Sequence, residues 1–132
     1  MSNNPQQKSV RVLVVDDEQP MITLVRSVLN SMGILDVATA LDGEQALEIV
    51  EDGGPPFDLV ISDWQMPVMD GITLLERFRA LYPGTPFVML TAKNDVKAFN
   101  DAKRSGATYF FMKPISPDDL AARLASLFLI ME

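Results

Sequence analysis

The sequence predicts an α/β fold: a doubly wound sheet of parallel strands with helices on both faces. Short β-branched segments alternate with amphipathic segments along the chain, which is the pattern of repeated βα units. Several of the short segments are apolar throughout, as strands that are covered on both faces must be. Five such units in 132 residues, of which 48% are apolar, indicate a single three-layer sandwich of ordinary domain size.

Five segments have the composition of strands, because they are rich in β-branched and aromatic residues and are bounded by turn residues. The expected strands are Val10–Val15, Asp36–Thr39, Leu59–Ser62, Phe87–Leu90 and Thr108–Met112. The residues before the first expected strand are mostly polar. We therefore expect residues 1–8 to form a flexible lead-in and residues 9–132 to form one domain.

Five helices are expected to alternate with these strands, and most carry their own start and stop signals. The signals are an Asp or Ser at the N-cap, a proline in the first turn, an apolar stripe and a glycine after the last turn. The expected helices run from about Pro20 to Met32, from the cap Asp42 to near Gly53, from the cap Asp70 to Pro83, from about Asp95 to Ser105, and from the cap Ser116 to about Ile130.

The composition excludes several kinds of chemistry. The chain has no cysteine and no histidine, which excludes a disulfide framework, a thiolate metal site and a histidine general base. Its net charge of -7 and its dispersed basic residues argue against direct nucleic-acid binding. No segment has the pattern of a signal peptide or the length of an apolar membrane span, so we expect a cytoplasmic protein without membrane insertion.

Polar side chains follow four of the expected strands. Asp16 and Asp17 come after the first strand, Asp63 after the third, Thr91 after the fourth and Lys113 after the fifth. The carboxyl ends of parallel strands meet at one edge of the sheet, and open sheets bind ligands there, near the switch point in strand order. We therefore expect these five residues to share one pocket.

Three carboxylates in one pocket repel one another, so at neutral pH they need a bound cation, or at least one of them must take up a proton. A divalent cation is the simplest solution. Because the donors are all oxygen atoms, Mg²⁺ fits better than zinc or copper. An aspartate can act as a nucleophile toward phosphorus, and we assign this role to Asp63 because Asp16 and Asp17 are adjacent and look like metal holders. Thr91 and Lys113 would then neutralise and position the transferred phosphoryl oxygens.

Four motifs together resemble a known family. They are Val12–Glu18 (VLVVDDE), Asp58–Gly71 (DLVISDWQMPVMDG), Leu90–Lys93 (LTAK) and Gly106–Pro114 (GATYFFMKP). In this order they resemble the receiver domain of bacterial response regulators of the CheY-like type, and the resemblance covers roughly residues 9 to 130. It implies a flavodoxin-like (βα)5 fold with strand order 2-1-3-4-5.

The resemblance also implies the acceptor and the metal ligands. Asp63 would accept a phosphoryl group from a sensor histidine kinase or a phosphotransfer protein. Asp17, Asp63 and the backbone carbonyl of Gln65 would bind Mg²⁺ directly, and Asp16 would act mainly through water. The chain would be a two-component signalling domain that assists only its own phosphorylation and dephosphorylation, and not an enzyme.

The resemblance further implies how a signal leaves the site. Thr91 and Lys113 would bind the phosphoryl oxygens, and the Lys113-Pro114 peptide bond would be cis. Thr91 and Phe110 would be the switch residues, with Phe110 at a position where tyrosine is frequent. Phosphorylation would then change the face formed by the fourth helix, fifth strand and fifth helix, which would control a downstream effector protein.

Two other interpretations use the same residues. Small Mg²⁺-dependent phosphatases of the haloacid dehalogenase class also form an aspartyl phosphate, but they carry a second acid two residues after the nucleophile, where this chain has Gln65. A receiver-like adaptor could bind a partner without being phosphorylated. The full set of acids, threonine and lysine speaks against that adaptor.

Overall fold

The computed structural model describes residues 9–92 and 96–131 of the chain. The expected lead-in, residues 1–8, lies outside the described residues, as do Lys93 of the third motif and the expected helix start at Asp95. The prediction of a flexible lead-in therefore stays a prediction.

Strands and helices alternate without exception along the described chain, as the sequence predicts. Their order is β1 (Arg11–Val15), α1 (Gln19–Ser31), β2 (Asp36–Ala40), α2 (Gly43–Glu51), β3 (Leu59–Asp63), α3 (Gly71–Leu81), β4 (Phe87–Thr91), α4 (Val96–Arg104), β5 (Tyr109–Met112) and α5 (Pro117–Met131).

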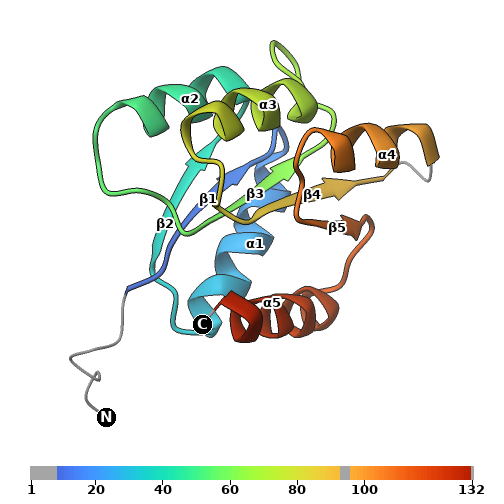
Figure 1. Ribbon diagram of the computed structural model, residues 1–132. Helices are drawn as coiled ribbons and strands as arrows, with labels where there is room; N and C mark the ends of the chain where they lie inside the picture. Colours follow the sequence, from blue (N-terminus) through green and yellow to red (C-terminus); the bar gives the residue numbers. More distant parts are fainter. Residues whose placement is uncertain (1–8, 93–95, 132) are drawn as a thin grey trace.

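The five strands form one parallel sheet in the order β2-β1-β3-β4-β5, which confirms the doubly wound fold. Figure 1 shows α1 and α5 covering one face of the sheet, while α2, α3 and α4 lie along the other. The chain moves from β1 outward to β2 and then returns past β1 to β3. The switch point in strand order therefore lies between β1 and β3.

Three strands are one residue longer at their carboxyl ends than the sequence predicts, and the first of them is β2, which includes Ala40. β3 includes Asp63 and β4 includes Thr91, because each is held in register by the neighbouring strand. Asp63 is paired with Leu90, and Thr91 with Met112. The two polar residues therefore belong to the rigid sheet and not to the loops that follow it.

The helix signals correspond to observed caps. Asp42 accepts a hydrogen bond from the Gln45 N–H at 2.8 Å, and Asp70 accepts one from the Thr73 N–H at 2.8 Å. Ser116 accepts one from the Asp119 N–H at 3.1 Å. These bonds satisfy backbone donors that the first turn of a helix leaves unpaired.

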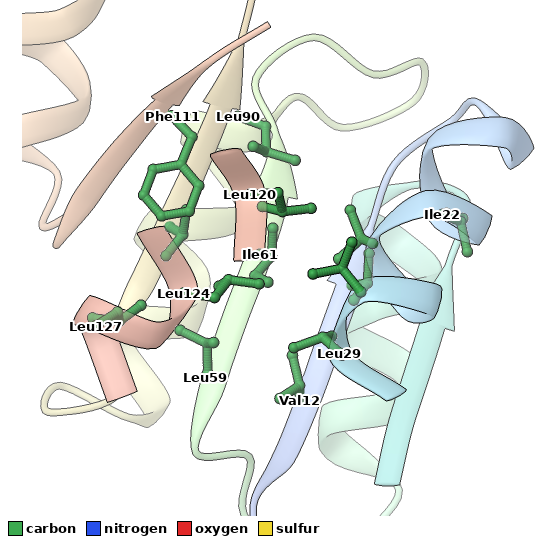
Figure 2. Packing of buried hydrophobic residues seen from close by; sticks show 14 residues of the cluster. Val12, Ile22, Leu29, Leu59, Ile61, Leu90, Phe111, Leu120, Leu124 and Leu127 are labelled. Carbon is green, nitrogen blue, oxygen red and sulfur yellow. The ribbon is translucent and has the colours of Figure 1, made fainter. Parts of the chain in front are cut away.

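Apolar side chains fill both sides of the sheet. Figure 2 shows the cluster between the sheet and the α1–α5 pair, in which the α5 residues Leu120, Leu124 and Leu127 face strand residues such as Leu59 and Ile61. A second cluster fills the side covered by α2 and α3. Within the described residues, no helix is both long enough and apolar enough to cross a membrane.

Candidate functional site

The carboxyl edge of the sheet holds the polar residues that the sequence singled out. Asp16 directly follows β1, and its N–H donates to the Ala40 carbonyl at 3.1 Å. Asp63 ends β3, and the next N–H, that of Trp64, donates to the Leu90 carbonyl at 2.8 Å. Sheet hydrogen bonds therefore hold one acid on each side of the switch point.

Three carboxylates gather there. Oxygen atoms of Asp16, Asp17 and Asp63 lie within 4.8 Å of one another. Asp16 and Asp63 are buried, whereas Asp17 is exposed. The predicted convergence of these acids is therefore present in the fold, and one side of the cluster opens to solvent.

Lys113 joins the cluster from the end of β5. Its ammonium lies 3.1 Å from Asp16 Oδ2 and 3.3 Å from Asp63 Oδ1. Its backbone N–H donates to the Thr91 carbonyl at 2.8 Å, and the Lys113-Pro114 peptide bond is cis, as expected. Residues from β1, β3, β4 and β5 are thus connected in one small region.

Charge is concentrated enough to change the acid–base behaviour of the site. Burial, followed by the negative charge of Asp16, raises the pKa of Asp63 to about 6, although Lys113 and the Trp64 N–H act in the opposite direction. Burial alone lowers the pKa of Lys113, but its contacts with Asp16 and Asp63 outweigh burial and raise this pKa overall. The lysine therefore stays charged, but its positive charge does not fully offset the burial of Asp63 and the repulsion from Asp16.

The residues present suit a hard divalent cation. The donor set is made of carboxylate oxygens, which Mg²⁺ prefers, and the raised pKa of Asp63 indicates negative charge that a cation would stabilise. Asp16 already accepts hydrogen bonds at both oxygens, from the Glu18 N–H at 2.9 Å and from Lys113. Asp17 and Asp63 are therefore better placed than Asp16 to bind a cation directly.

Gln65 lies two residues after Asp63 in an exposed loop. The prediction that its backbone carbonyl binds the metal therefore stays a prediction.

The two residues predicted to act as switches lie on neighbouring strands. Thr91 is buried at the end of β4. Phe110 lies in β5 opposite Met89 and packs against the cluster under α2 and α3, while Tyr109 packs on the opposite side of the sheet. The alternation expected for Tyr109 and Phe110 is therefore present.

Gly71 has a positioning role that the sequence pattern did not reveal. It begins α3, and a Cβ there would clash with the Asp63 carbonyl oxygen and lie 3.1 Å from the Trp64 Cα. The Gly71 N–H donates to the Trp64 carbonyl at 2.8 Å. Glycine has a low helix propensity, so its presence directly after the helix cap Asp70 needs another reason. That unusual position was the one feature of the sequence that could have indicated a close backbone approach.

Comparison with known proteins identifies the family. The family model for the response regulator receiver domain matches residues 12–125, which is most of the chain. The chain belongs to the response-regulator receiver domain family. The receiver-domain match includes both acids after β1, the acceptor candidate, Thr91 and Lys113.

Two curated relatives illustrate the range of proteins that contain this domain. The two-component response regulator ORR41 of rice is 40% identical over 122 residues, which are 89% of this chain and 94% of that protein. The transcriptional regulatory protein ZraR of Escherichia coli K12 is 38% identical over 116 residues, which are 88% of this chain. The chain spans only 26% of the length of ZraR.

Solved receiver structures agree with the fold. The chemotaxis protein CheY4 of Vibrio cholerae superimposes with a TM-score of 0.82 at 34% sequence identity, covering 90% of this chain and 98% of that one. A CheY-like receiver domain protein of Methanospirillum hungatei gives a TM-score of 0.84 at 27% identity, covering 94% and 97%. The expected CheY-like fold is therefore confirmed.

Proposed function

We propose that this receiver domain is a phosphorylation-dependent switch in which Asp63 is the phosphoryl acceptor. The donor is the phosphohistidine of a sensor histidine kinase or a phosphotransfer protein. A carboxylate oxygen of Asp63 bonds to phosphorus, the bond from phosphorus to the donor nitrogen breaks, and the donor imidazole takes up a proton. The observation that carries this proposal is the position of Asp63 at the switch point, 3.3 Å from the Lys113 ammonium and beside two further acids.

Each neighbour of Asp63 has a separate role in the proposal. Lys113 stabilises negative charge on the transferred oxygens, and the Thr91 hydroxyl donates to one of them. Asp17 and Asp63, with the Gln65 carbonyl, would hold Mg²⁺, and Asp16 would act mainly by holding Lys113 in place. When bound, Mg²⁺ would neutralise the acids and the incoming phosphoryl charge.

The output would leave the site through β4 and β5. Phosphorylation replaces one negative charge at Asp63 with roughly two. Thr91 and Phe110 respond, and the face made by α4, β5 and α5 shifts between two populations. Direct contact between the Lys113 N–H and the Thr91 carbonyl supports this route, because it couples the ends of both strands.

The partner at that face would be an effector protein and not a nucleic acid, because the chain carries a net charge of -7. We place this exchange in the cytoplasm. Receiver domains are signalling domains and in general not enzymes, which favours the switch over a phosphatase. The match to ZraR, a transcriptional regulatory protein, covers 26% of its length, so the regulatory activity of that whole protein is not carried over to this chain.

The test is incubation with acetyl phosphate, with and without Mg²⁺, followed by intact mass measurement. One added phosphoryl group is expected only with Mg²⁺. Asp63→Asn should abolish it, whereas Asp42→Asn, which retains the helix-capping group at a site outside the pocket, should not. An equal yield of phosphoprotein from Asp63→Asn would rule out Asp63 as the acceptor, and steady hydrolysis of many phosphomonoesters would favour the phosphatase.

A further inference from the structure

The last turn of α3 carries an arginine that donates three hydrogen bonds. The guanidinium of Arg79 donates from Nε to the Gly106 carbonyl at 3.0 Å and from Nη1 to the Tyr82 carbonyl at 3.0 Å. Its Nη2 donates to Thr108 Oγ1 at 3.3 Å. Tyr82 is the C-cap of α3, whereas Gly106 and Thr108 lie between α4 and β5. One side chain therefore closes the end of α3 and fastens the α4–β5 loop to it.

The α4–β5 loop is shaped around this guanidinium. Gly106 has φ of 102°, in the left-handed region that favours glycine, and a Cβ there would lie 3.0 Å from Arg79 Nε. Thr108 Oγ1 also accepts the Phe87 N–H at 3.0 Å, and the Thr108 N–H donates to the Phe87 carbonyl at 2.8 Å. The loop is therefore held between the end of α3 and the amino end of β4.

A further hydrogen bond joins α3 to the same loop. The hydroxyl of Ser105, the residue directly after α4, donates to Glu76 Oε2 at 3.2 Å. Glu76 lies about one turn of α3 before Arg79, on the face of the sheet that α3 shares with α4 (Figure 1). We call the hydrogen bonds of Glu76 and Arg79 to Ser105, Gly106 and Thr108 the α3 anchor. It fixes the carboxyl end of α4 to the neighbouring helix.

The sequence of α4, VKAFNDAKR, gives the helix little apolar surface with which to pack. Five of its nine residues are polar or charged, namely Lys97, Asn100, Asp101, Lys103 and Arg104. A helix with a narrow apolar stripe gains little from packing, so its position depends strongly on what holds its ends. The α3 anchor holds the carboxyl end, whereas the amino end follows Thr91, the β4 residue that belongs to the pocket.

The anchored end of α4 is also connected to the acceptor by α3 itself. α3 has 11 residues and begins at Gly71, where an added Cβ would clash with the Asp63 carbonyl oxygen. The Gly71 N–H donates to the Trp64 carbonyl at 2.8 Å. Both ends of α3 are therefore fastened, one beside the acceptor backbone and the other at the α4–β5 loop.

We infer that Arg79 is a positioning residue of the switch, which keeps the carboxyl end of α4 and the start of β5 fixed on α3. Phosphorylation of Asp63 then moves the amino end of α4 about this fixed end. The inference rests on the proposed function, and it adds a fixed point to the face formed by α4, β5 and α5. Segments with few stabilising contacts are the ones that open and move, which places the change at the less fastened end.

The first experiment measures hydrogen exchange of single amides by NMR, in the whole chain with Mg²⁺, before and after addition of acetyl phosphate. Phosphorylation should change exchange at residues 97–101 about fivefold or more, and at residues 105–108 less than about twofold. Asp63→Asn corrects for effects of acetyl phosphate itself. A change at residues 105–108 as large as that at residues 97–101 overturns the inference, and this result depends on no Arg79 variant.

The second experiment repeats this measurement on Arg79→Gln. Phosphorylation should now also change exchange at residues 105–108, by about fivefold, the order expected when one net hydrogen bond is lost. Arg79→Lys retains a charged donor and should give a smaller change. Arg77→Gln is the matched control, because Arg77 is exposed on the same helix, and it should respond like the parent chain.

A purely structural role for Arg79 predicts a different pattern. Arg79→Gln would then raise exchange at residues 105–108 equally with and without phosphorylation, and this result overturns the inference. Failure of acetyl phosphate to phosphorylate the parent chain is distinguishable from both patterns, since it overturns the proposed function and this inference with it.

Discussion

At the scale of single residues, the Asp63 carboxyl combines burial, a neighbouring negative charge and a lysine partner, and the first two outweigh the third. Its pKa is raised from 3.8 to about 6. This is the reverse of the usual carboxyl case, because the folded state now binds the proton more tightly than the unfolded state. Without metal, the Asp63 contribution to the free energy of unfolding is therefore most favourable below about pH 4 and decreases as pH rises toward about 6.

Asp63→Asn should remove this penalty. In the absence of divalent metal, the variant and the parent should be similarly stable near pH 4. Above about pH 6 the variant should be more stable by roughly 1–3 kcal/mol, because one pKa unit corresponds to about 1.4 kcal/mol. Urea unfolding in the presence of a chelator across this pH range measures the difference. The exposed Glu48→Gln serves as control, and a parallel pH profile for Asp63→Asn and the parent would contradict the prediction.

Gly71→Ala should disturb Asp63, the candidate acceptor, through the backbone. The added methyl group would clash with the Asp63 carbonyl oxygen and lie 3.0 Å from the Met89 sulfur, and a main-chain carbonyl in a sheet cannot easily move. We expect a loss of roughly 1–3 kcal/mol in the free energy of unfolding, typical of overpacking, and slower phosphorylation by acetyl phosphate.

Gly84→Ala is the matched control for that substitution. Gly84 lies in the turn after α3, its backbone is not left-handed, and a Cβ added there would have no neighbouring atom within 4 Å. Its replacement should be neutral or stabilising by up to about 1 kcal/mol. Equal behaviour of the two alanine variants in urea unfolding would show that the Gly71 approach is unimportant.

At the scale of elements, the first turn of α3 is important because the loop that follows Asp63 leads directly into it. Asp70→Ala removes the acceptor of the Thr73 N–H hydrogen bond and should lower the free energy of unfolding by roughly 0.5–2 kcal/mol. Asp70→Asn retains a capping oxygen and should be nearly neutral. Chemical denaturation distinguishes the two, and equal losses for both would assign the effect to charge instead of capping.

Elements were predictable wherever their cause is local. Helix caps such as Asp42 and Asp70 act on residues three positions away, and apolar stripes repeat within one helix, so both are readable in a linear sequence. The carboxyl ends of β2, β3 and β4 were each predicted one residue short, because pairing with a neighbouring strand decides where each strand ends. That pairing is not a local property.

The loop after Asp63 was the least predictable part of the site. No local rule places Val68 in the left-handed region, because glycine or asparagine is the usual signal for such a turn. The close approach of Gly71 to Asp63 is likewise visible only when α3 is packed against β3. Both departures from local preference lie beside the candidate acceptor, where conflicts between local preference and the global fold are expected.

At the scale of the whole molecule, the parallel sheet is what brings the site together. The Lys113 ammonium contacts Asp16 across a separation of 97 residues in the sequence. The rule that ligands bind at the carboxyl edge of a parallel sheet was enough to predict that these residues converge. The charge balance among them was not predictable, since it depends on burial and on distances that the strand order alone does not supply.

The whole fold should gain stability from Mg²⁺, because the acidic cluster exists only in the folded state. With Mg²⁺ at 100 times its dissociation constant, the free energy of unfolding should rise by about 2.7 kcal/mol. Asp17→Asn should remove most of this gain, whereas the exposed Glu48→Gln should retain it. Thermal unfolding with and without Mg²⁺ measures the effect, and fluorescence of Trp64, the single tryptophan and the neighbour of Asp63, provides an independent reading of binding.

The gain from Mg²⁺ should also depend on pH, because the cation competes with the proton on Asp63. The pKa of about 6 applies to the metal-free protein, so binding near pH 5 must displace a proton that is already absent near pH 8. The apparent affinity for Mg²⁺ should be about tenfold lower at pH 5 than at pH 8. At a fixed, saturating Mg²⁺ concentration, the gain in the free energy of unfolding should then be about 1.4 kcal/mol smaller at pH 5. A titration of Trp64 fluorescence at both pH values provides the measurement. If the apparent affinity is the same at both, Asp63 is not a ligand of the cation.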